Sequence, residues 1–141
     1  MQVFVPFPEP IRVVQVLDSR RRNKQIIETE QILQAIGGFG KGWINHPIVK
    51  MYSPYADWLL HYHGCFCSWK IGDPGAAQIF NDEAMKIIPP FLTPDFCDQH
   101  KRRLYTKAPD LYPQFSGYGK SEENWYYIGG QIIKYIKGKR I

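Results

Sequence analysis

The chain has 141 residues, an apolar fraction of 44 %, an aromatic fraction of 15 % and a formal net charge of +5 at pH 7. This length fits one domain with its own core, and the apolar fraction excludes a largely disordered chain. No run of about 18 apolar residues is present, so no membrane-spanning helix is expected. A basic, aromatic-rich protein favours an anionic partner, with nucleic acid first, although many basic proteins bind nothing acidic.

The cysteines and the amino terminus indicate an intracellular protein. Cys65, Cys67 and Cys97 are an odd number, and the first two are too close for a routine mutual disulfide. This usage is typical of a reducing compartment. The stretch MQVFVPFPEP has neither a basic region nor a long apolar core, so it is not expected to be a signal peptide.

The first third of the chain predicts an extended segment followed by a long helix. Prolines at 6, 8 and 10 predict an extended lead-in over residues 1–10. A helix is predicted from about Asp18 to Ile36, capped by Asp18 or Ser19 and ended by the glycines at 37–38, with a loop over 37–42. Its expected apolar stripe comprises the Arg22 stem, Ile26, Thr29, Leu33 and Ile36.

The remaining elements are also expected to be helical until the last twenty residues. Asn45 can cap a second helix, with Pro47 in its first turn. Apolar spacing predicts a helix over 56–69, a break at 72–75, a short helix over 76–87 and, after a proline-rich loop, a helix over 95–107. Residues 109–124 are expected to be a loop, and WYYI-GG-QIIKYI predicts a β-hairpin with a two-residue turn. We therefore expect a mainly α, small single-domain helical bundle with long loops and a short C-terminal β-hairpin.

The stretch RRRNKQIIETEQIL, residues 20–33, combines a basic run with carboxylates. On a helix Arg21, Lys24 (or Gln25) and Glu28 lie three or four residues apart, so they share a face at the edge of the apolar stripe. One interpretation is a surface that holds a polyanion against a reactive carboxylate. The alternative is a solvated helix with a Lys24–Glu28 surface pair, worth a few tenths of a kcal/mol.

Two histidine-bearing motifs have competing interpretations. In GWINHP, residues 42–47, Asn45 and His46 are placed on a loop to contact a phosphate or a base, or else they form the start of a helix. In HYHGCFC, residues 61–67, four potential zinc ligands alternate as on one face of a strand. The surrounding apolar spacing is helical, and a helix would bring only His61 and Cys65 together, so no metal site is expected.

The stretch HKRRLYTKAPDLYPQFSGYGK, residues 100–120, joins a basic helix face to an aromatic loop. His100, Lys101, Arg103 and Lys107 would form that face. The loop aromatics could stack on unpaired bases, at about 1–3 kcal/mol per base. The alternative is that these rings belong to the core.

Three stretches in this order resemble the pyrimidine-dimer DNA glycosylase (endonuclease V-type) family of phages and bacteria, in a divergent branch. They are LDSRRRNKQIIETEQIL at 17–33, GWINHPIVKMYSPY at 42–55, and HKRRLYTKAPDLYPQF at 100–115 with GYGK after it. The resemblance implies a small helical domain that binds duplex DNA and flips out a base. It also implies imine chemistry, in which an N-terminal α-amine attacks the sugar C1′ with a helix glutamate assisting.

The resemblance places Glu28 at the family's glutamate position and Arg21 where the family has a histidine near the lesion. The family's amine belongs to a small second residue, whereas this chain has Gln2, whose size disfavours removal of Met1. The amine is therefore expected to come from Met1, from Gln2 or from Lys24, or else catalysis is lost. The residues expected to contact DNA are Arg20, Arg21, Arg22, Gln25, Asn45, His46, His100, Lys101, Arg103, Lys107, Tyr112, Phe115 and Tyr118.

The sequence thus predicts a single domain over 1–141 that binds damaged DNA and excises a base, without a cofactor or a membrane, in the cytoplasm of a bacterium or a phage-infected cell. Residues from about 121 to 141 are expected to be an extension beyond the resemblance. One alternative is a non-catalytic relative that binds nucleic acid, a nucleotide or a small anionic ligand. Another is an interaction protein that offers the hairpin edge to partners.

Overall fold

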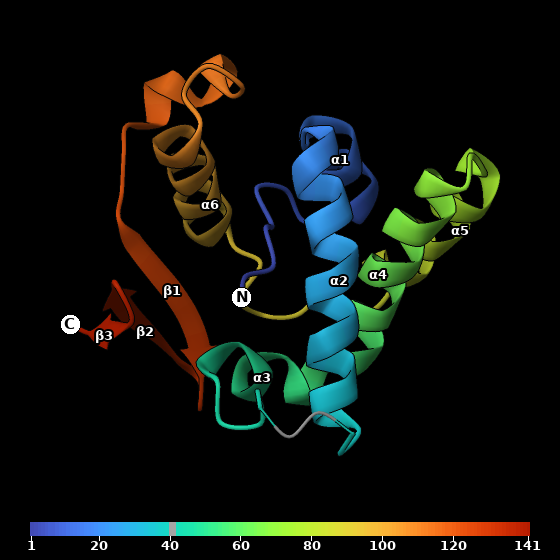
Figure 1. Cartoon of the computed structure of the whole chain (residues 1–141), viewed down its shortest axis with the longest axis horizontal. Coiled ribbons are helices and arrows are strands. Elements are labelled where there is room, and N and C mark those ends of the chain that lie inside the picture. Colours follow the sequence, from blue (N-terminus) through green and yellow to red (C-terminus); the bar gives the residue numbers. More distant parts are fainter. Residues whose placement is uncertain (40–41) are drawn as a thin grey trace.

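The computed structural model describes residues 1–39 and 42–141, and it confirms a mainly helical domain with a small C-terminal sheet (Figure 1). Residues 40 and 41 of the predicted glycine-rich loop lie outside the described residues. None of the helices in the described part of the chain is long and apolar enough to span a membrane. The helices are α1 Pro10–Val16, α2 Ser19–Ile36, α3 Pro47–Tyr52, α4 Ala56–Lys70, α5 Pro74–Met85 and α6 Pro94–Lys107, with the 3₁₀ helices η1 Ser53–Tyr55 and η2 Pro113–Tyr118 and the strands β1 Glu123–Ile128, β2 Gln131–Ile136 and β3 Lys139–Arg140.

Helix α2 begins and ends at the capping residues that the sequence predicts. The Asp18 side chain accepts a hydrogen bond from the backbone N of Arg21 at 3.3 Å, as expected of an N-cap carboxylate. Gly37 follows the last helical residue, and its N–H returns to the carbonyl of Leu33. Both predicted boundaries of this helix are therefore confirmed.

Two predictions about helix starts are wrong. The short α1 was not predicted, because Pro10 was interpreted as a helix breaker although proline is well tolerated at the first helical position. The cap of α3 is His46 rather than Asn45, since the His46 ring nitrogen Nδ1 accepts from the Ile48 N–H at 3.1 Å. Asn45 is exposed.

The predicted helix over 56–69 is confirmed as α4, and it carries much of the aromatic core. Trp58, Tyr62 and Phe66 are all buried along one side of it. A Cβ at Gly64 would lie 2.6 Å from the Phe80 ring, so this glycine allows α5 to pack closely against α4.

The buried side of α2 differs from the predicted stripe. Its buried residues are Gln25, Glu28, Thr29, Ile32 and Ala35, so of the five stripe positions only Thr29 is buried. The reason is that α2 packs on α4 and also against the chain's first residues, whose backbone groups bond to the polar side chains of Gln25 and Glu28.

The N-terminal segment lies between α2 and α6, where Figure 1 shows the chain's start near the centre of the fold. The Phe4 N–H donates to Oε1 of Gln25 at 2.9 Å, and the Val5 N–H donates to Nδ1 of His100 at 3.1 Å. Tyr62 donates its hydroxyl to the Phe4 carbonyl at 2.7 Å. Buried side chains from three helices therefore fix the position of residues 2–5.

The predicted hairpin is confirmed, and a third strand extends it. Gly129 and Gly130 both have positive φ angles, 62° and 78°, as a tight two-residue hairpin turn requires. Trp125 and Tyr127 pack toward Phe96 and Phe91 of the core. Because side chains alternate along a strand, Asn124 and Tyr126 lie on the opposite face of β1.

Candidate active site

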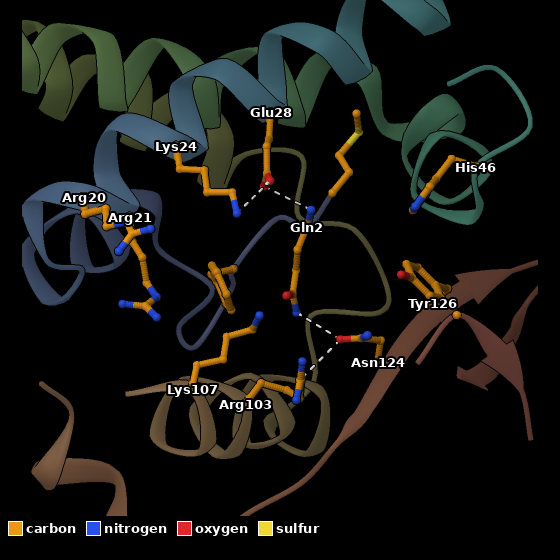
Figure 2. Close-up of a pocket in the computed structure, with 13 residues that line it drawn as sticks. Gln2, Arg20, Arg21, Lys24, Glu28, His46, Arg103, Lys107, Asn124 and Tyr126 are labelled. Carbon is orange, nitrogen blue, oxygen red and sulfur yellow. Dashed lines mark hydrogen bonds and ion pairs between the residues drawn. The ribbon is translucent and has the colours of Figure 1, made fainter. Parts of the chain in front are cut away.

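A cavity of about 420 Å³ lies between α2, α6 and β1, with the N-terminal segment at its floor (Figure 2). Its walls come from parts of the sequence that are far apart. Its lining residues are Met1, Gln2, Phe4, Arg20, Arg21, Lys24, Glu28, His46, Arg103, Lys107, Asn124, Tyr126 and Gly138.

Glu28 presents its carboxylate to this cavity from the middle of α2. Its oxygen Oε2 accepts from the Gln2 backbone N at 3.0 Å and from Nε2 of Gln25 at 3.3 Å. Its other oxygen lies 3.8 Å from Nζ of Lys24. Glu28 is only 8 % exposed, so these contacts hold a nearly buried carboxylate in one orientation.

Cations dominate the rest of the lining. Arg20, Arg21 and Lys24 come from α2, and Arg103 and Lys107 come from α6 across the cavity. Glu28 is the only carboxylate among the lining residues of this cavity in the described chain. The cavity is therefore suited to an anionic ligand.

Burial lowers the pKa of both α6 cations, and nearby positive charges add to this effect only for Lys107. Burial lowers the pKa of Lys107, and the charges of Arg103, Lys24 and Arg21 lower it further. Burial also lowers the pKa of Arg103. A lysine whose pKa is lowered has more neutral amine at a given pH than an ordinary lysine, which makes it a potential nucleophile as well as an anion ligand.

Arg103 is held by the segment that leads into the sheet. Its Nε donates to Oδ1 of Asn124 at 3.2 Å, and its Nη1 donates to the Ser121 carbonyl at 2.9 Å. The same Asn124 oxygen accepts from Nε2 of Gln2 at 3.4 Å. Asn124 therefore connects the sheet, α6 and the N-terminal segment at the edge of the cavity, as Figure 2 shows.

His46 offers a donor to the cavity. Burial and the positive charge of the chain's amino terminus lower its pKa, so the neutral ring is favoured. Because Nδ1 accepts from the Ile48 N–H, the proton of the neutral ring is on Nε2. The ring meets Tyr126 edge-on, with centroids 6.1 Å apart.

Nine of the predicted site residues thus meet in one cavity, and β1 adds two that were not predicted. The nine are Met1, Gln2, Arg20, Arg21, Lys24, Glu28, His46, Arg103 and Lys107. Asn124 and Tyr126 were missed because the sequence pattern predicts a hairpin but not which helix faces it. Alternation along a strand predicts that two residues separated by two positions share a face, so the sequence could have paired Asn124 with Tyr126 but could not have assigned them to the site.

Four other predicted contacts lie outside the cavity lining. The Arg22 guanidinium donates to the Val14 carbonyl at 2.7 Å and so ties α2 to α1. Asn45 is exposed but not part of the lining. Lys101 pairs with Asp98 at 3.0 Å and lies over the ring of Tyr118, which is 40 % exposed. Their proposed contact with DNA stays a prediction.

Four further predictions conflict with burial. Gln25 is 1 % exposed and His100 is 6 % exposed, because both bond to the N-terminal backbone. Tyr112 and Phe115 are 0 % and 4 % exposed, and the Tyr112 hydroxyl bonds to Asp18. These residues are core or scaffold, so the stacking platform expected of Tyr112 and Phe115 is wrong.

The HYHGCFC stretch lies within α4, as its apolar spacing predicted. Nε2 of His63 lies 3.3 Å from Sγ of Cys67, and Nδ1 of His63 lies 2.7 Å from the Thr29 hydroxyl. The contact with Thr29 connects α4 to α2, and the contact with Cys67 shows that His61 and Cys65 are not the only potential ligand pair that the helix brings together. Across the described ranges, no cluster of three or more His, Cys, Asp or Glu side chains is arranged to hold a metal ion.

No curated protein and no solved structure matches the chain. Residues 1–68 match the family model described as pyrimidine dimer DNA glycosylase. The matched part contains Glu28, Arg20, Arg21, Lys24 and His46, whereas the α6 and β1 walls of the cavity lie beyond it. This match confirms the resemblance and supports, broadly, a DNA repair glycosylase role. Residues 1–68, just under half of the chain, are therefore similar to the pyrimidine dimer DNA glycosylase family.

Proposed function

We propose that the cavity is the active site of a DNA glycosylase that also cleaves the DNA strand through an imine intermediate. The observation that carries this proposal is the position of Glu28, a nearly buried carboxylate in a cavity otherwise lined by cations. Amines and this carboxylate face one another there, which is the arrangement that imine chemistry at a sugar carbon needs.

In the proposed reaction an amine nitrogen forms a bond to C1′ while the bond from C1′ to the base breaks. The base leaves with a proton, the sugar ring opens, and the amine nitrogen becomes part of a positively charged imine. Glu28 stabilises this charge, because its carboxylate faces the amines of the cavity. A proton then leaves C2′, and the bond from C3′ to its phosphate breaks. Glu28 is positioned to take that proton.

The surrounding cations would hold the DNA during this reaction. Arg20, Arg21 and Lys107 line the cavity from both sides, so they can contact phosphates that flank the reacting sugar. A neutral His46 would donate a hydrogen bond from Nε2 to an oxygen of the sugar or the base. The proposed ligand is therefore duplex DNA with a damaged or flipped nucleotide.

Three amines line the cavity and compete for the role of nucleophile. They are the α-amine of Met1, Nζ of Lys24 and Nζ of Lys107. Nζ of Lys24 forms an ion pair with Glu28 at 3.8 Å, but the Lys24 side chain is 69 % exposed. Lys107 was expected only to contact DNA, but its lowered pKa makes it a candidate nucleophile as well. Removal of Met1 would replace its α-amine with that of Gln2, whose nitrogen is 3.0 Å from Glu28.

Reductive trapping tests the proposal and identifies the amine. The protein is incubated with an abasic-site duplex and borohydride, and the covalent adduct is digested and mapped by mass spectrometry. An adduct on one of the cavity amines supports the proposal. Binding of the duplex without any adduct contradicts it, as does an adduct only on a lysine outside the cavity, such as Lys86 at the C-terminal cap of α5.

The excess of cations also favours a second candidate function. Five cations and one carboxylate line the cavity, which would suit a nucleotide or another small anion without any covalent chemistry. The same experiment distinguishes the two. A non-catalytic relative would protect the cavity lysines from acetylation when it binds an anion, and it would form no adduct with abasic DNA.

A further inference from the structure

The turn between β2 and β3 borders the candidate active site. Gly138 lines the cavity, and it forms a two-residue turn together with Lys137. The φ angles are positive at both residues, 50° at Lys137 and 78° at Gly138, which suits a tight turn between antiparallel strands. The turn carries cations, and three of the last five residues are Lys137, Lys139 and Arg140.

The register of the sheet separates these cations by face. Arg140 pairs with Tyr135, which in turn pairs with Asn124, so these three share the face that lines the cavity. Lys139 pairs with Ile136, and Lys134 pairs with Trp125, so both lysines belong to the opposite face. Nζ of Lys134 lies 4.6 Å from the centre of the Trp125 ring.

The sheet is fixed relative to the cavity. α6 is bonded to η2 through Nε of Arg102, which donates to the Tyr118 carbonyl at 3.1 Å, and to the first residue of β1 through Nε2 of Gln99, which donates to the Glu123 carbonyl at 2.8 Å. Together with the two bonds of Arg103, these contacts hold β1 as a wall of the cavity. The turn therefore has a defined position at the cavity edge.

Lys137 and Arg140 are exposed, and neither forms an ion pair with a carboxylate in the residues that the structure describes. Both lie within two residues of Gly138, which lines the cavity together with Arg103 and Lys107, so they add positive charge near its edge. Free cations that adjoin a cationic cavity are suited to a polyanion that extends past it, and the DNA backbone carries such regularly spaced charges.

We propose that Lys137 and Arg140 bind phosphates of the duplex next to the nucleotide held in the cavity. This inference rests on the proposed function for its partner, DNA, but not for the imine chemistry. The C-terminal sheet then has two roles, since its β1 strand is a wall of the site and its β2–β3 turn extends the DNA surface.

A pair of matched double variants tests this inference. Lys137→Gln with Arg140→Gln removes the cation of the turn and the one on the cavity face of β3, whereas Lys134→Gln with Lys139→Gln removes two from the opposite face of the same strands. Affinity for a duplex of about 25 base pairs with a central abasic site is measured across a salt series. The first variant should lower the magnitude of the log–log salt slope by about 1.8, or about 0.9 per phosphate contact, and should weaken binding about tenfold or more at low salt. The control should match the wild type.

Equal slopes for the wild type and the first variant contradict the inference, as do equal losses in both variants. Melting temperatures confirm that both variants are folded.

Borohydride trapping at saturating DNA separates this inference from the proposed chemistry, because the first variant should still form the wild-type amount of adduct. A reduced slope without any adduct in the wild type supports the phosphate contacts and contradicts the proposed chemistry. Adduct formation by the wild type, together with an unchanged salt slope in the first variant, supports the proposed chemistry and contradicts the phosphate contacts.

Discussion

The Gln2 backbone nitrogen lies 3.0 Å from Oε2 of Glu28, so the start of the chain is bonded to the carboxylate of the cavity. The two residues are separated by 26 positions in the sequence, and this contact places the chain's first residues next to the proposed chemistry. It depends on a network around Gln25, which leads to a first prediction.

Gln25→Leu should destabilise the protein by about 2–4 kcal/mol. Its side chain accepts from the Phe4 N–H and from the Tyr62 hydroxyl, and it donates to the Gln2 carbonyl at 2.8 Å. Leucine would leave the buried Phe4 N–H and the part-buried Gln2 carbonyl without this partner, at about 1–3 kcal/mol for each, whereas the Tyr62 hydroxyl keeps its bond to the Phe4 carbonyl. Urea unfolding measures the loss. Gln34→Leu, at an exposed position on the same helix, should change stability by less than about 0.5 kcal/mol, and equal effects in the two variants would contradict the network.

His100 should make the fold sensitive to acid. Burial, with a smaller contribution from the charge of Arg103, lowers the pKa of His100 to about 3. An unfolded chain binds a proton at this histidine below about pH 6.5, whereas the folded protein does not until about pH 3. The free energy of unfolding should therefore fall as the pH falls, by roughly 2 kcal/mol between pH 7 and pH 5.

His100→Gln should remove most of this pH dependence. Unfolding is measured in urea across the same pH range for both proteins. The wild type keeps any contribution from His46 and His63, whose pKa values are also lowered, so the difference between the two profiles reports on His100. Parallel profiles would show that the ring titrates normally.

Phe115→Ala should act on stability and not on DNA recognition. The ring is buried, so its loss should cost about 3–5 kcal/mol. In the fraction that is folded, affinity for intact duplex and for abasic-site duplex should change equally. A selective loss for the abasic duplex with an unchanged melting temperature would restore the stacking role. Tyr118→Ala, at a more exposed ring of the same segment, is the control for stability.

Asn124→Asp should weaken DNA binding through Arg103. The new carboxylate would lie against the Arg103 guanidinium, now 3.2 Å from the Asn124 oxygen, and would offset its charge. The log–log salt slope should lose about 0.9 in magnitude, as for one phosphate contact. Gln78→Glu on α5 introduces the same charge far from the cavity lining and should leave the slope unchanged.

Local signals predicted the elements but only part of the site. Arg20, Arg21, Lys24 and Glu28 could be grouped because helical spacing places residues three or four apart on one side. Asn124 could not be added to them, since its contact with Gln2 joins residues 122 positions apart.

The sequence also did not predict which polar side chains are buried. Periodicity favoured the apolar Ile26 and Leu33 for the covered side of α2, whereas the fold covers Gln25 and Glu28. These side chains are buried because they satisfy backbone donors of a distant segment, and no local pattern reports such a need. His100 was predicted to lie on a basic surface, whereas it is buried because its ring accepts from the Val5 N–H of the same distant segment.

The most direct test of the account compares the wild type with Glu28→Gln on abasic-site duplex, with strand cleavage and binding measured separately. Glutamine keeps the size and most hydrogen bonds of Glu28 but removes its charge. We expect the variant to bind DNA as well as the wild type or slightly better, while cleavage and borohydride trapping slow by about 10²–10⁴-fold. Cleavage at the wild-type rate by the variant, or binding without cleavage by the wild type, would contradict it and leave an anion-binding cavity without this chemistry.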